Sequence, residues 1–293
     1  MTSAEHLPIT VSVDWLRERL GAEDLVIADV RGTSAGPGKG TGRYRPLREE
    51  YLEAHIPGAH FVDWTSDIVD VGGDVPFQIA RSEHYVGVLR RLGIEADTPV
   101  VAYDGYHNSL ATRFVWTLRY FGHDRNAVLD GGITAWREAG GPVATEVPEP
   151  VGRGFDPRPR PALRRTLEEV WASLDRDVVL IDARAVAEYS GEDSRAERYG
   201  HIPGAHNVPF KSVVDDHQRY LPPDALAERF RAAGLAPEAL HDREVVVYCN
   251  GGVTATSVAT ALELAGGPRA AIYDGSWNEW GNRADVPVER SDA

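Results

Sequence analysis

The chain has 293 residues, of which 42% are hydrophobic and 26% are charged, a balance typical of a globular protein with room for two domains. Its formal net charge of -14 argues against nucleic acid or an anionic membrane surface as a partner, because both are bound through clustered Lys and Arg. The single cysteine excludes an intramolecular disulfide and a cysteine-based metal cluster. We see neither a signal peptide nor an apolar run long enough for a membrane span, so we expect a cytoplasmic protein.

The first half of the chain alternates patterns typical of helices and strands. Residues 12–20 are predicted to form a helix with Ser12 as its N-cap, and residues 25–30 a buried apolar strand. The Gly-rich residues 36–43 lack the Ser or Thr that a P-loop requires after its lysine, so we interpret them as a flexible insertion. The later elements expected here are the word His-Ile-Pro-Gly-Ala at 55–59, helices at 82–92, 111–121 and 133–138, and strands at 100–103 and 127–129.

The second half repeats this order at similar offsets. Asp182 follows Asp29 by 153 residues, and Asp274 follows Asp130 by 144. The word His-Ile-Pro-Gly-Ala returns letter for letter at residues 201–205. We therefore predict two tandem copies of one α/β domain, each a parallel sheet flanked by helices on both faces. The matching elements of the second copy are helices at 166–174 and 254–264 and strands at 178–184 and 245–248.

A proline-rich stretch separates the two copies. Six prolines fall between residues 141 and 165, and because proline fixes φ and removes a hydrogen-bond donor, this stretch is a poor helix or strand. We predict an N-terminal domain at residues 1–143, an extended linker at 144–165 and a C-terminal domain at 166–293.

The only cysteine, Cys249, directly follows a predicted strand and precedes a Gly-rich turn and a helix. Backbone N–H groups and the helix dipole favour a thiolate at such a place, and ligands of parallel sheets bind at the carboxyl ends of the strands. The alternative is a small buried residue that closes the strand. In the first copy Asp104 occupies the equivalent position, so only the second copy carries a nucleophile and we expect the first to be catalytically inactive.

Four features together resemble the two-domain rhodanese family of thiosulfate and 3-mercaptopyruvate sulfurtransferases. They are the duplicated Asp-x-Arg strand ends, the paired His-Ile-Pro-Gly-Ala words, the Cys-x-x-Gly-Val-Thr-Ala loop at 249–255, and Tyr-Asp-Gly-Ser-Trp-Asn-Glu-Trp at 273–280. The resemblance covers nearly the whole chain. It implies an inactive N-terminal domain, an active C-terminal domain and a persulfide carried by Cys249, in a scheme that requires no metal and no organic cofactor.

The residues after Cys249 are the candidates for binding the transferred sulfur and its donor. Successive N–H groups that curve around the sulfur, continued by a helix N-terminus, stabilise both a thiolate and an anionic persulfide. The two glycines allow a close approach of the backbone, and the Thr hydroxyl adds a donor. The predicted loop contacts are Asn250, Gly251, Gly252, Val253 and Thr254.

The sulfur donor is less clearly indicated. Thiosulfate-type loops of the family carry cationic residues after the cysteine and mercaptopyruvate-type loops read Cys-Gly-Ser-Gly-Val-Thr, whereas Asn250 and Gly251 match neither. The mercaptopyruvate enzymes are thought to combine that Ser with a His and an Asp of the first domain, and residues 61–76 contain no His. We therefore slightly favour thiosulfate over 3-mercaptopyruvate, with cyanide or a thiol as the acceptor and a monomeric enzyme.

Two arginines are candidates for binding an anionic donor. Arg195 and Arg198 lie just before the second His-Ile-Pro-Gly-Ala, where the family places a substrate-binding Arg, and a guanidinium matches sulfonate or carboxylate oxygens. The alternative is that both are solvated surface charges. The family's other usual Arg is replaced by Glu188.

Other conspicuous residues are given structural roles. Arg31 and Arg184 each follow a strand-end Asp by two residues, and we expect them to pair with neighbours and hold the strand ends. The two histidines of each His-Ile-Pro-Gly-Ala-His segment occur in both copies, whereas only one copy has a cysteine, which argues against metal binding.

Functions of other classes remain open. A phosphotyrosine-type phosphatase needs an Arg six residues after its Cys, and Ala255 stands there. A noncatalytic sulfur-binding module and a redox sensor are further alternatives, although a sensor would lack a resolving Cys within the chain.

Overall fold

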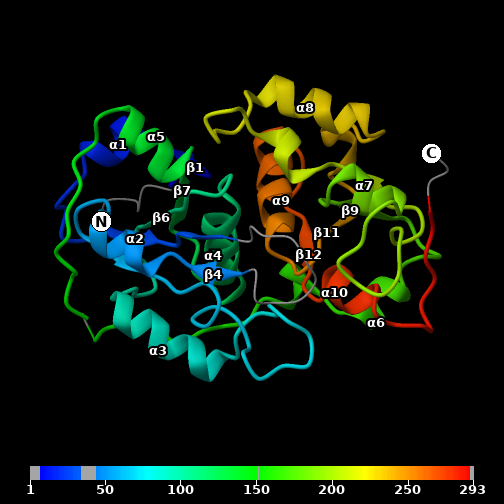
Figure 1. The fold of residues 1–293 in the computed structure, drawn as a ribbon, viewed down its shortest axis with the longest axis horizontal. Coiled ribbons are helices and arrows are strands. Elements are labelled where there is room, and N and C mark those ends of the chain that lie inside the picture. Colours follow the sequence, from blue (N-terminus) through cyan, green and yellow to red (C-terminus); the bar gives the residue numbers. More distant parts are fainter. Residues whose placement is uncertain (1–6, 34–43, 151, 291–293) are drawn as a thin grey trace.

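The computed structural model describes residues 7–33, 44–150 and 152–290, which form two α/β units side by side (Figure 1). The Gly-rich segment 36–43 lies outside these residues. The elements of the first unit are β1 (Thr10–Val11), α1 (Val13–Arg17), β2 (Val26–Asp29), β3 (Gly32–Thr33), β4 (Arg45–Pro46), α2 (Arg48–Glu53), β5 (Ala59–Phe61), α3 (Ser82–Leu92), β6 (Val100–Tyr103), α4 (Ser109–Tyr120), β7 (Asn126–Leu129) and α5 (Gly132–Glu138).

The second unit repeats these elements with additional short helices. Its helices and strands are η2 (Pro161–Leu163), β8 (Arg164–Arg165), α6 (Leu167–Trp171), β9 (Val178–Asp182), α7 (Val186–Ser190), β10 (His206–Asn207), η3 (Phe210–Val213), α8 (Pro223–Ala232), η4 (Pro237–Leu240), β11 (Glu244–Tyr248), α9 (Thr254–Leu264), β12 (Ala271–Tyr273) and α10 (Ser276–Trp280), where η denotes a 3₁₀ helix. None of the helices in the described residues is long and apolar enough to span a membrane.

Each unit is built on a parallel sheet, as predicted, and each of the two sheets has five strands. The order is β1-β7-β6-β2-β5 in the first sheet and β8-β12-β11-β9-β10 in the second, so every strand has a counterpart at the same place. In register, Tyr103 lies opposite Asp29 and Tyr248 lies opposite Asp182. The central strands β6 and β11 therefore end at equivalent points, directly before Asp104 and Cys249.

Both faces of each sheet are covered by helices, which explains the unbroken apolar strands. In β11, Val245 and Val247 pack with residues of α8 and α9, whereas Val246 and Tyr248 pack with residues of α6 and α10. A parallel strand buried on both faces needs apolar residues at every position rather than at alternate ones. The prediction of two α/β domains with helices on both faces is confirmed.

Most predicted helices form, with local chemistry that fixes their starts. Ser12 caps α1 by accepting a hydrogen bond from the Trp15 amide, and Thr166 forms a capping box with Glu169 at α6. Helices α3 and α9 have the predicted bounds. The helices predicted at 12–20 and 166–174 are shorter, because a turn replaces the last residues of each.

The duplicated Asp-x-Arg and His-Ile-Pro-Gly-Ala motifs form the same hydrogen-bonded arrangement in both units. Asp29 pairs with Arg31 at 2.8 Å and accepts the Tyr103 hydroxyl at 2.6 Å, and that hydroxyl accepts the Ile56 amide at 3.2 Å. Asp182 pairs with Arg184 in the second unit, where the Ile202 amide donates to the Tyr248 hydroxyl at 3.1 Å. Each His-Ile-Pro-Gly-Ala turn is thus tied to the end of the central strand, and the structural role expected for both arginines is confirmed.

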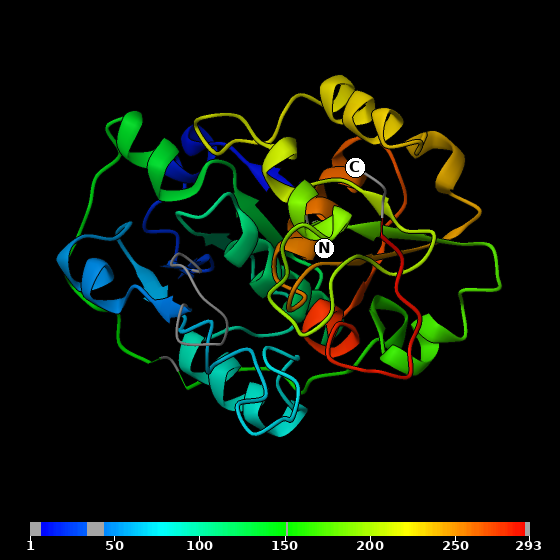
Figure 2. The same cartoon turned by 45° about the vertical axis from the view of Figure 1, so that its right-hand side comes forward.

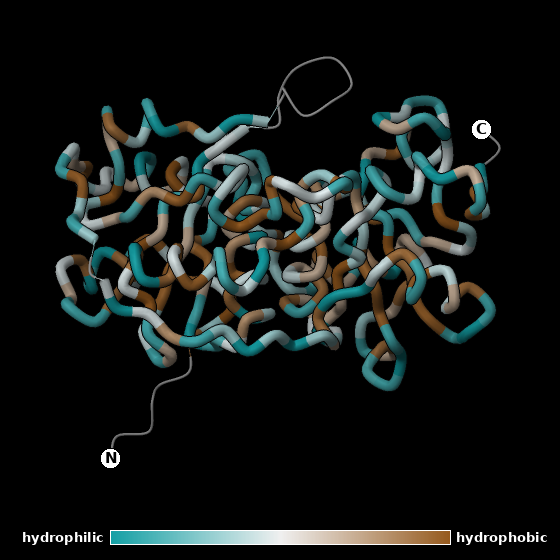
Figure 3. The backbone as a smooth tube through the Cα atoms, turned by 90° about the horizontal axis from the view of Figure 1, so that it is seen from below, coloured by the Kyte–Doolittle hydropathy of each residue, from teal (hydrophilic) through white to brown (hydrophobic). Residues whose placement is uncertain are grey.

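The two units meet through their equivalent helices α4 and α9, which lie next to each other in the middle of the molecule (Figure 2). Thr112 and Thr256, which occupy matching positions of the repeat, share a buried hydrogen bond of 2.9 Å between their hydroxyl oxygens. One apolar core cluster contains residues of both sheets, including Val100 and Val245. In Figure 3 the hydrophobic segments run mainly through the interior of the molecule, continuing from one unit into the other.

The described residues of the proline-rich stretch, 144–150 and 152–165, are mostly extended and contact the first unit. Ala144 forms a β-bridge with His55, and the amides of Arg158 and Arg160 donate to carbonyl groups at the end of α4. Its last two residues form β8, the edge strand of the second sheet. The stretch therefore connects the two sheets through hydrogen bonds rather than as a free tether.

Candidate active site

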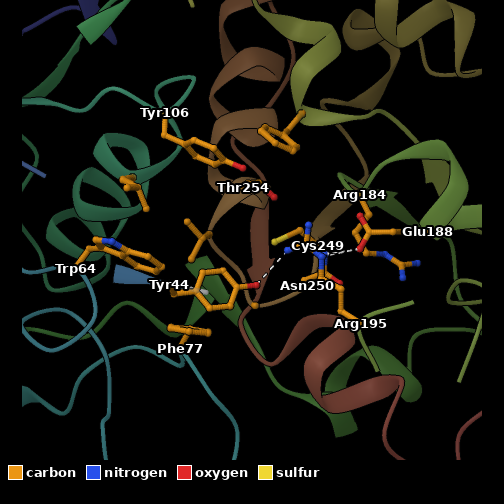
Figure 4. A pocket seen from close by; sticks show the side chains of 14 residues that line it. Tyr44, Trp64, Phe77, Tyr106, Arg184, Glu188, Arg195, Cys249, Asn250 and Thr254 are labelled. Atoms are coloured by element: carbon orange, nitrogen blue, oxygen red, sulfur yellow. Dashed lines mark hydrogen bonds and ion pairs between the residues drawn. The ribbon is translucent and has the colours of Figure 1, made fainter. Parts of the chain in front are cut away.

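Cys249 lies at the boundary of the two units, at the carboxyl end of β11. Its side chain is buried, with 2% of its surface exposed, and it lines a pocket of about 510 Å³ that includes space open to solvent. Figure 4 shows aromatic side chains on one side of Cys249 and charged side chains on the other. The lining residues that carry polar or aromatic groups are Tyr44, Trp64, Phe77, Tyr106, Arg184, Glu188, Arg195, Phe210, Asn250 and Thr254.

The carbonyl groups of the loop after β11 are held from outside. The Cys249 carbonyl accepts the Trp277 amide at 3.0 Å, and the Asn250 carbonyl accepts the Asn278 amide at 2.7 Å. Both donors belong to the start of α10. Because the C=O and N–H of a trans peptide point in opposite directions, these bonds turn the following amide groups toward the inside of the loop.

The amide groups of the loop are free to bind a ligand. None of the N–H groups of residues 250–255 donates a hydrogen bond to another group of the described structure. A run of successive free N–H groups that leads into a helix is the arrangement that binds anions. The loop is therefore suited to a thiolate and to the anionic persulfide formed from it.

The equivalent loop of the first unit already holds an anionic group. The buried carboxylate of Asp104 accepts the amides of Tyr106, Leu110 and Ala111 at 2.7, 2.7 and 2.9 Å. Burial raises the pKa of Asp104, and the backbone donors act in the opposite direction. In the first unit, three loop amides are therefore already bonded to the side chain of Asp104, which stands at the position of Cys249 in the second unit.

Two glycines let the loop after β11 fit its surroundings. Gly252 has a φ of +72°, and a Cβ there would lie 3.0 Å from Nη1 of Arg113. A Cβ at Gly251 would lie 2.9 Å from Nδ2 of Asn278. The close neighbours of both glycines are thus residues outside the loop, and only Gly251 lines the pocket.

Arg184 lines the pocket in addition to holding its strand end. Its Nε and Nη2 bond to Asp182, whereas its buried Nη1 has no hydrogen-bond partner. Burial lowers the pKa of Arg184 and the Asp182 carboxylate raises it, with a net rise. The sequence interpretation of a structural role missed this free donor, because spacing alone does not show which face of a guanidinium is used.

Arg195 lies in the pocket but its charge is compensated. Its Nε is 3.0 Å from the Glu188 carboxylate, and its Nη1 donates to the Tyr44 hydroxyl at 3.2 Å. The same Glu188 oxygen accepts Nδ2 of Asn250 at 2.9 Å. Burial lowers the pKa of Arg195 and Glu188 raises it, for a net rise. Glu188 therefore connects the arginine to the loop that follows Cys249.

Arg198 does not line the pocket. Its Nη1 donates to the carbonyl oxygens of Arg283 and Val286, each at 2.6 Å, so its side chain holds the C-terminal segment instead. Both arginines lie in a loop. In a loop, unlike in a helix, a separation of three residues does not place two side chains on the same face. We therefore leave Arg198 out of the site.

The aromatic wall was missed by the sequence interpretation. Tyr44, Trp64 and Phe77 come from loops of the first unit, and Tyr44 and Phe77 meet edge to face with ring centroids 4.6 Å apart. Their spacing follows no motif, because loops bring the three rings together within the first unit, and the rings lie near Cys249 only through the packing of the two units. Of the three, only Phe77 has a positive φ, +68°, which indicates a constrained backbone. This constraint is visible only in the structure.

The histidines of the repeated turns have internal partners. His55 stacks on Tyr51 with ring centroids 4.0 Å apart, and His201 stacks on Tyr189 at 3.8 Å. Among the described residues, no group of three or more His, Cys, Asp or Glu side chains is arranged to hold a metal ion.

Comparison with known proteins agrees with the duplicated fold. The profile of the rhodanese-like domain matches this chain twice, at residues 12–139 and 166–283. The chain belongs to the rhodanese family. Cys249 and its loop lie within the second of the two rhodanese-like domains, and Asp104 lies within the first.

This rhodanese is similar to curated sulfurtransferases over most of its length. It is 34% identical to the 3-mercaptopyruvate sulfurtransferase of Escherichia coli K12, with 95% of this chain and 97% of the relative covered. It is 33% identical to the thiosulfate sulfurtransferase of Bos taurus, covering 94% and 92%. The crystal structure of SseA from Escherichia coli superposes with a TM-score of 0.80 at 30% identity, covering 92% of this chain and 99% of that one.

We predict that Gly252→Ala disturbs the loop after β11, with Gly266→Ala as a matched control. Both glycines have positive φ, +72° and +82°, so each substitution costs about 1–2 kcal/mol of unfolding free energy. Only Gly252 has close neighbours for a new Cβ. The rate of Cys249 alkylation by iodoacetamide is expected to fall about tenfold in Gly252→Ala and to stay unchanged in Gly266→Ala. Equal alkylation rates in both variants would contradict this role of Gly252.

Proposed function

We propose that this rhodanese transfers sulfane sulfur through a persulfide on Cys249. The observation that carries the proposal is the position of this thiol, at the start of a run of free amide groups and inside a pocket between the domains. We assign catalysis to residues 166–293, a noncatalytic role to residues 1–143 and the connection to residues 144–165. In this assignment the first domain supplies part of the pocket wall.

The reaction proceeds by double displacement. The Cys249 thiolate attacks the outer sulfur of the donor, the sulfur–sulfur bond of thiosulfate breaks, and its electron pair leaves with sulfite. The enzyme is left as an anionic persulfide, Cys–S–S⁻. Cyanide or another thiophile then attacks the terminal sulfur, which gives thiocyanate or its equivalent and restores the thiolate. The free amides of residues 250–255 stabilise the negative charge in both resting forms.

The leaving group supports thiosulfate as the donor. Sulfite leaves as a stable anion, whereas pyruvate formation from 3-mercaptopyruvate requires a proton at carbon. No histidine lines the described pocket, and Gly251 provides no hydroxyl. Arg184 and Arg195, which both line the pocket, supply cationic side chains for the sulfonate oxygens.

The charge balance supports 3-mercaptopyruvate as a second candidate donor. Arg184 pairs with Asp182 and Arg195 pairs with Glu188, so these groups leave the pocket without net positive charge. Thiosulfate carries two negative charges, and 3-mercaptopyruvate with a protonated thiol carries one. The similarity to the 3-mercaptopyruvate sulfurtransferase of Escherichia coli points the same way.

The burial of Cys249 also limits the acceptor. With 2% of its surface exposed, the residue is reached through the pocket, which suits a small thiophile such as cyanide or a low-molecular-weight thiol. We place this reaction in the cytoplasm and assign it to the monomer. Phosphoryl transfer is disfavoured, because the residue six positions after Cys249 is the fully buried Ala255.

Incubation with each donor tests the persulfide directly. We expect thiosulfate to add about 32 Da, one sulfur atom, to the peptide that contains Cys249, and cyanide to remove it as thiocyanate. Cys249→Ser is the control and is expected to take up no sulfur. Addition from 3-mercaptopyruvate alone would reverse the order of the donors. If neither donor adds the mass, or if Cys249→Ser retains transfer activity, the proposal is wrong and a noncatalytic module becomes the better interpretation.

The two arginines of the same loop offer a matched test of the anion site. Arg195→Ala removes a pocket cation and leaves Glu188 uncompensated, so the KM for thiosulfate is expected to rise about tenfold with a smaller change in kcat. Arg198→Ala removes only contacts to the C-terminal segment and is expected to leave KM unchanged. An unchanged KM in Arg195→Ala would remove this residue from the donor site.

A further inference from the structure

An arginine of the first domain reaches the catalytic loop of the second. Arg113 lies on α4 and is fully buried, and its Nη1 donates to the Gly252 carbonyl at 3.1 Å. Its Nη2 donates to the Asp274 carboxylate at 2.7 Å and to the Phe77 carbonyl at 2.8 Å. One guanidinium therefore contacts the catalytic loop, the residue after β12 and the pocket wall.

The bond to Gly252 fixes the orientation of one peptide in the loop. Because the peptide is planar and trans, holding the Gly252 carbonyl toward Arg113 turns the Val253 N–H to the opposite side, into the loop. Gly252 is also the loop residue with positive φ, where the backbone can rotate at little cost. Without a donor such as Arg113 to hold the Gly252 carbonyl, this peptide is free to flip. A flipped peptide would present a carbonyl oxygen to the sulfur.

We propose that Arg113 is a positioning residue, which keeps the Gly252–Val253 peptide turned so that its N–H faces the sulfur of Cys249. This proposal rests on the persulfide function proposed above and deepens it. It gives the first domain a role in the reaction of the second. A flipped peptide would place a partial negative charge near the thiolate, and both the thiolate and the persulfide would lose a donor.

Asp274, the ion-pair partner of Arg113, also holds the pocket wall. Asp274 is fully buried, and its second carboxylate oxygen accepts the Ile79 amide at 2.8 Å and Nε of Arg164 at 3.0 Å. Phe77, which lines the pocket, is thus held at its own carbonyl by Arg113 and two residues later by Asp274. The loop and the wall that faces it are fixed by one ion pair.

A second arginine of α4, Arg119, forms an ion pair between the domains that serves as a structural comparison. Arg119 reaches Glu263 of α9 at 3.2 Å, and its Nε donates to Asn126 at 3.0 Å. It therefore also connects the two domains through a largely buried guanidinium, but it does not touch the catalytic loop. Buried ion pairs contribute little net stability as a class, so fold stabilisation alone does not explain why Arg113 contacts Gly252.

Arg113→Lys separates the ion pair from the loop contact. A lysine keeps the charge beside Asp274 but lacks the fork that reaches three oxygens at once, so the bond to Gly252 is lost first. Arg119→Lys is the matched control. For each variant we would measure the urea unfolding midpoint, the pH profile of Cys249 alkylation by iodoacetamide, and kcat and KM with thiosulfate.

In Arg113→Lys we expect the alkylation profile to move to higher pH by about one unit. We expect kcat to fall about tenfold with a smaller change in KM. Arg119→Lys is expected to alter only the unfolding midpoint. Should Arg113→Lys fail to fold, Arg113→Gln, which keeps an amide donor at this position and leaves Arg164 as the ion-pair partner of Asp274, is measured in the same way.

Superimposable alkylation profiles for the Arg113 variant, the Arg119 variant and the unmodified chain would overturn the proposal and leave Arg113 as a domain contact. The alkylation profile needs no turnover, so it reports on the loop even if no sulfur donor is accepted. A shifted profile in a chain that forms no persulfide would support the positioning role and contradict the function proposed above.

Discussion

The constraint on which this rhodanese depends is the set of backbone N–H groups that follows each central strand. A parallel strand ends, the chain turns, and a helix begins within a few residues, so several amides in succession lack partners of their own. Such a turn favours a hydrogen-bond acceptor, and above all an anion, at its centre. In the first domain the Asp104 carboxylate accepts three of these amides, and in the second domain the equivalent residue is Cys249. One architecture thus gives a closed structural turn in one copy and a candidate reaction centre in the other.

The duplication also explains how a pocket forms around so deeply buried a thiol. The equivalent helices α4 and α9 pack against each other, which brings the loops of the first domain over the carboxyl end of the second sheet. The second domain contributes the sulfur and the charged side chains, and the first contributes the aromatic wall and the guanidinium of Arg113. The first domain, which has Asp104 at the position of Cys249, therefore still contributes to the pocket, because residues of both domains line it.

The fold was largely predictable because its signals are local. Two unbroken apolar strands before Asp104 and Cys249, and the helix bounds at Ser82–Leu92 and Thr254–Leu264, follow from burial on both faces and from the turns around them. The position of the thiol at a strand end was predictable for the same reason. Side-chain direction was not, and Arg198 shows this, since a loop has no periodicity that places residues on one face.

The parts of the site that sequence reasoning missed are set by contacts over long separations. Arg113 lies 139 residues from the Gly252 carbonyl that it holds, and Tyr44 lies 151 residues from Arg195. Neither contact leaves a motif, because each depends on how two complete domains pack. The free Nη1 of Arg184 is a related case, in which one side chain serves its own strand end and also faces the pocket.

We propose that the amides of residues 250–255 stabilise the charge of the transferred sulfur. The most direct measurement is the ¹H–¹⁵N spectrum of these amides before and after treatment with the sulfur donor, and again after cyanide. We expect persulfide formation to move the resonances of several of these amide protons downfield together, and cyanide to return them to their starting positions. Changes confined to Cys249 and its immediate neighbours, with the other loop amides unaffected, would contradict it.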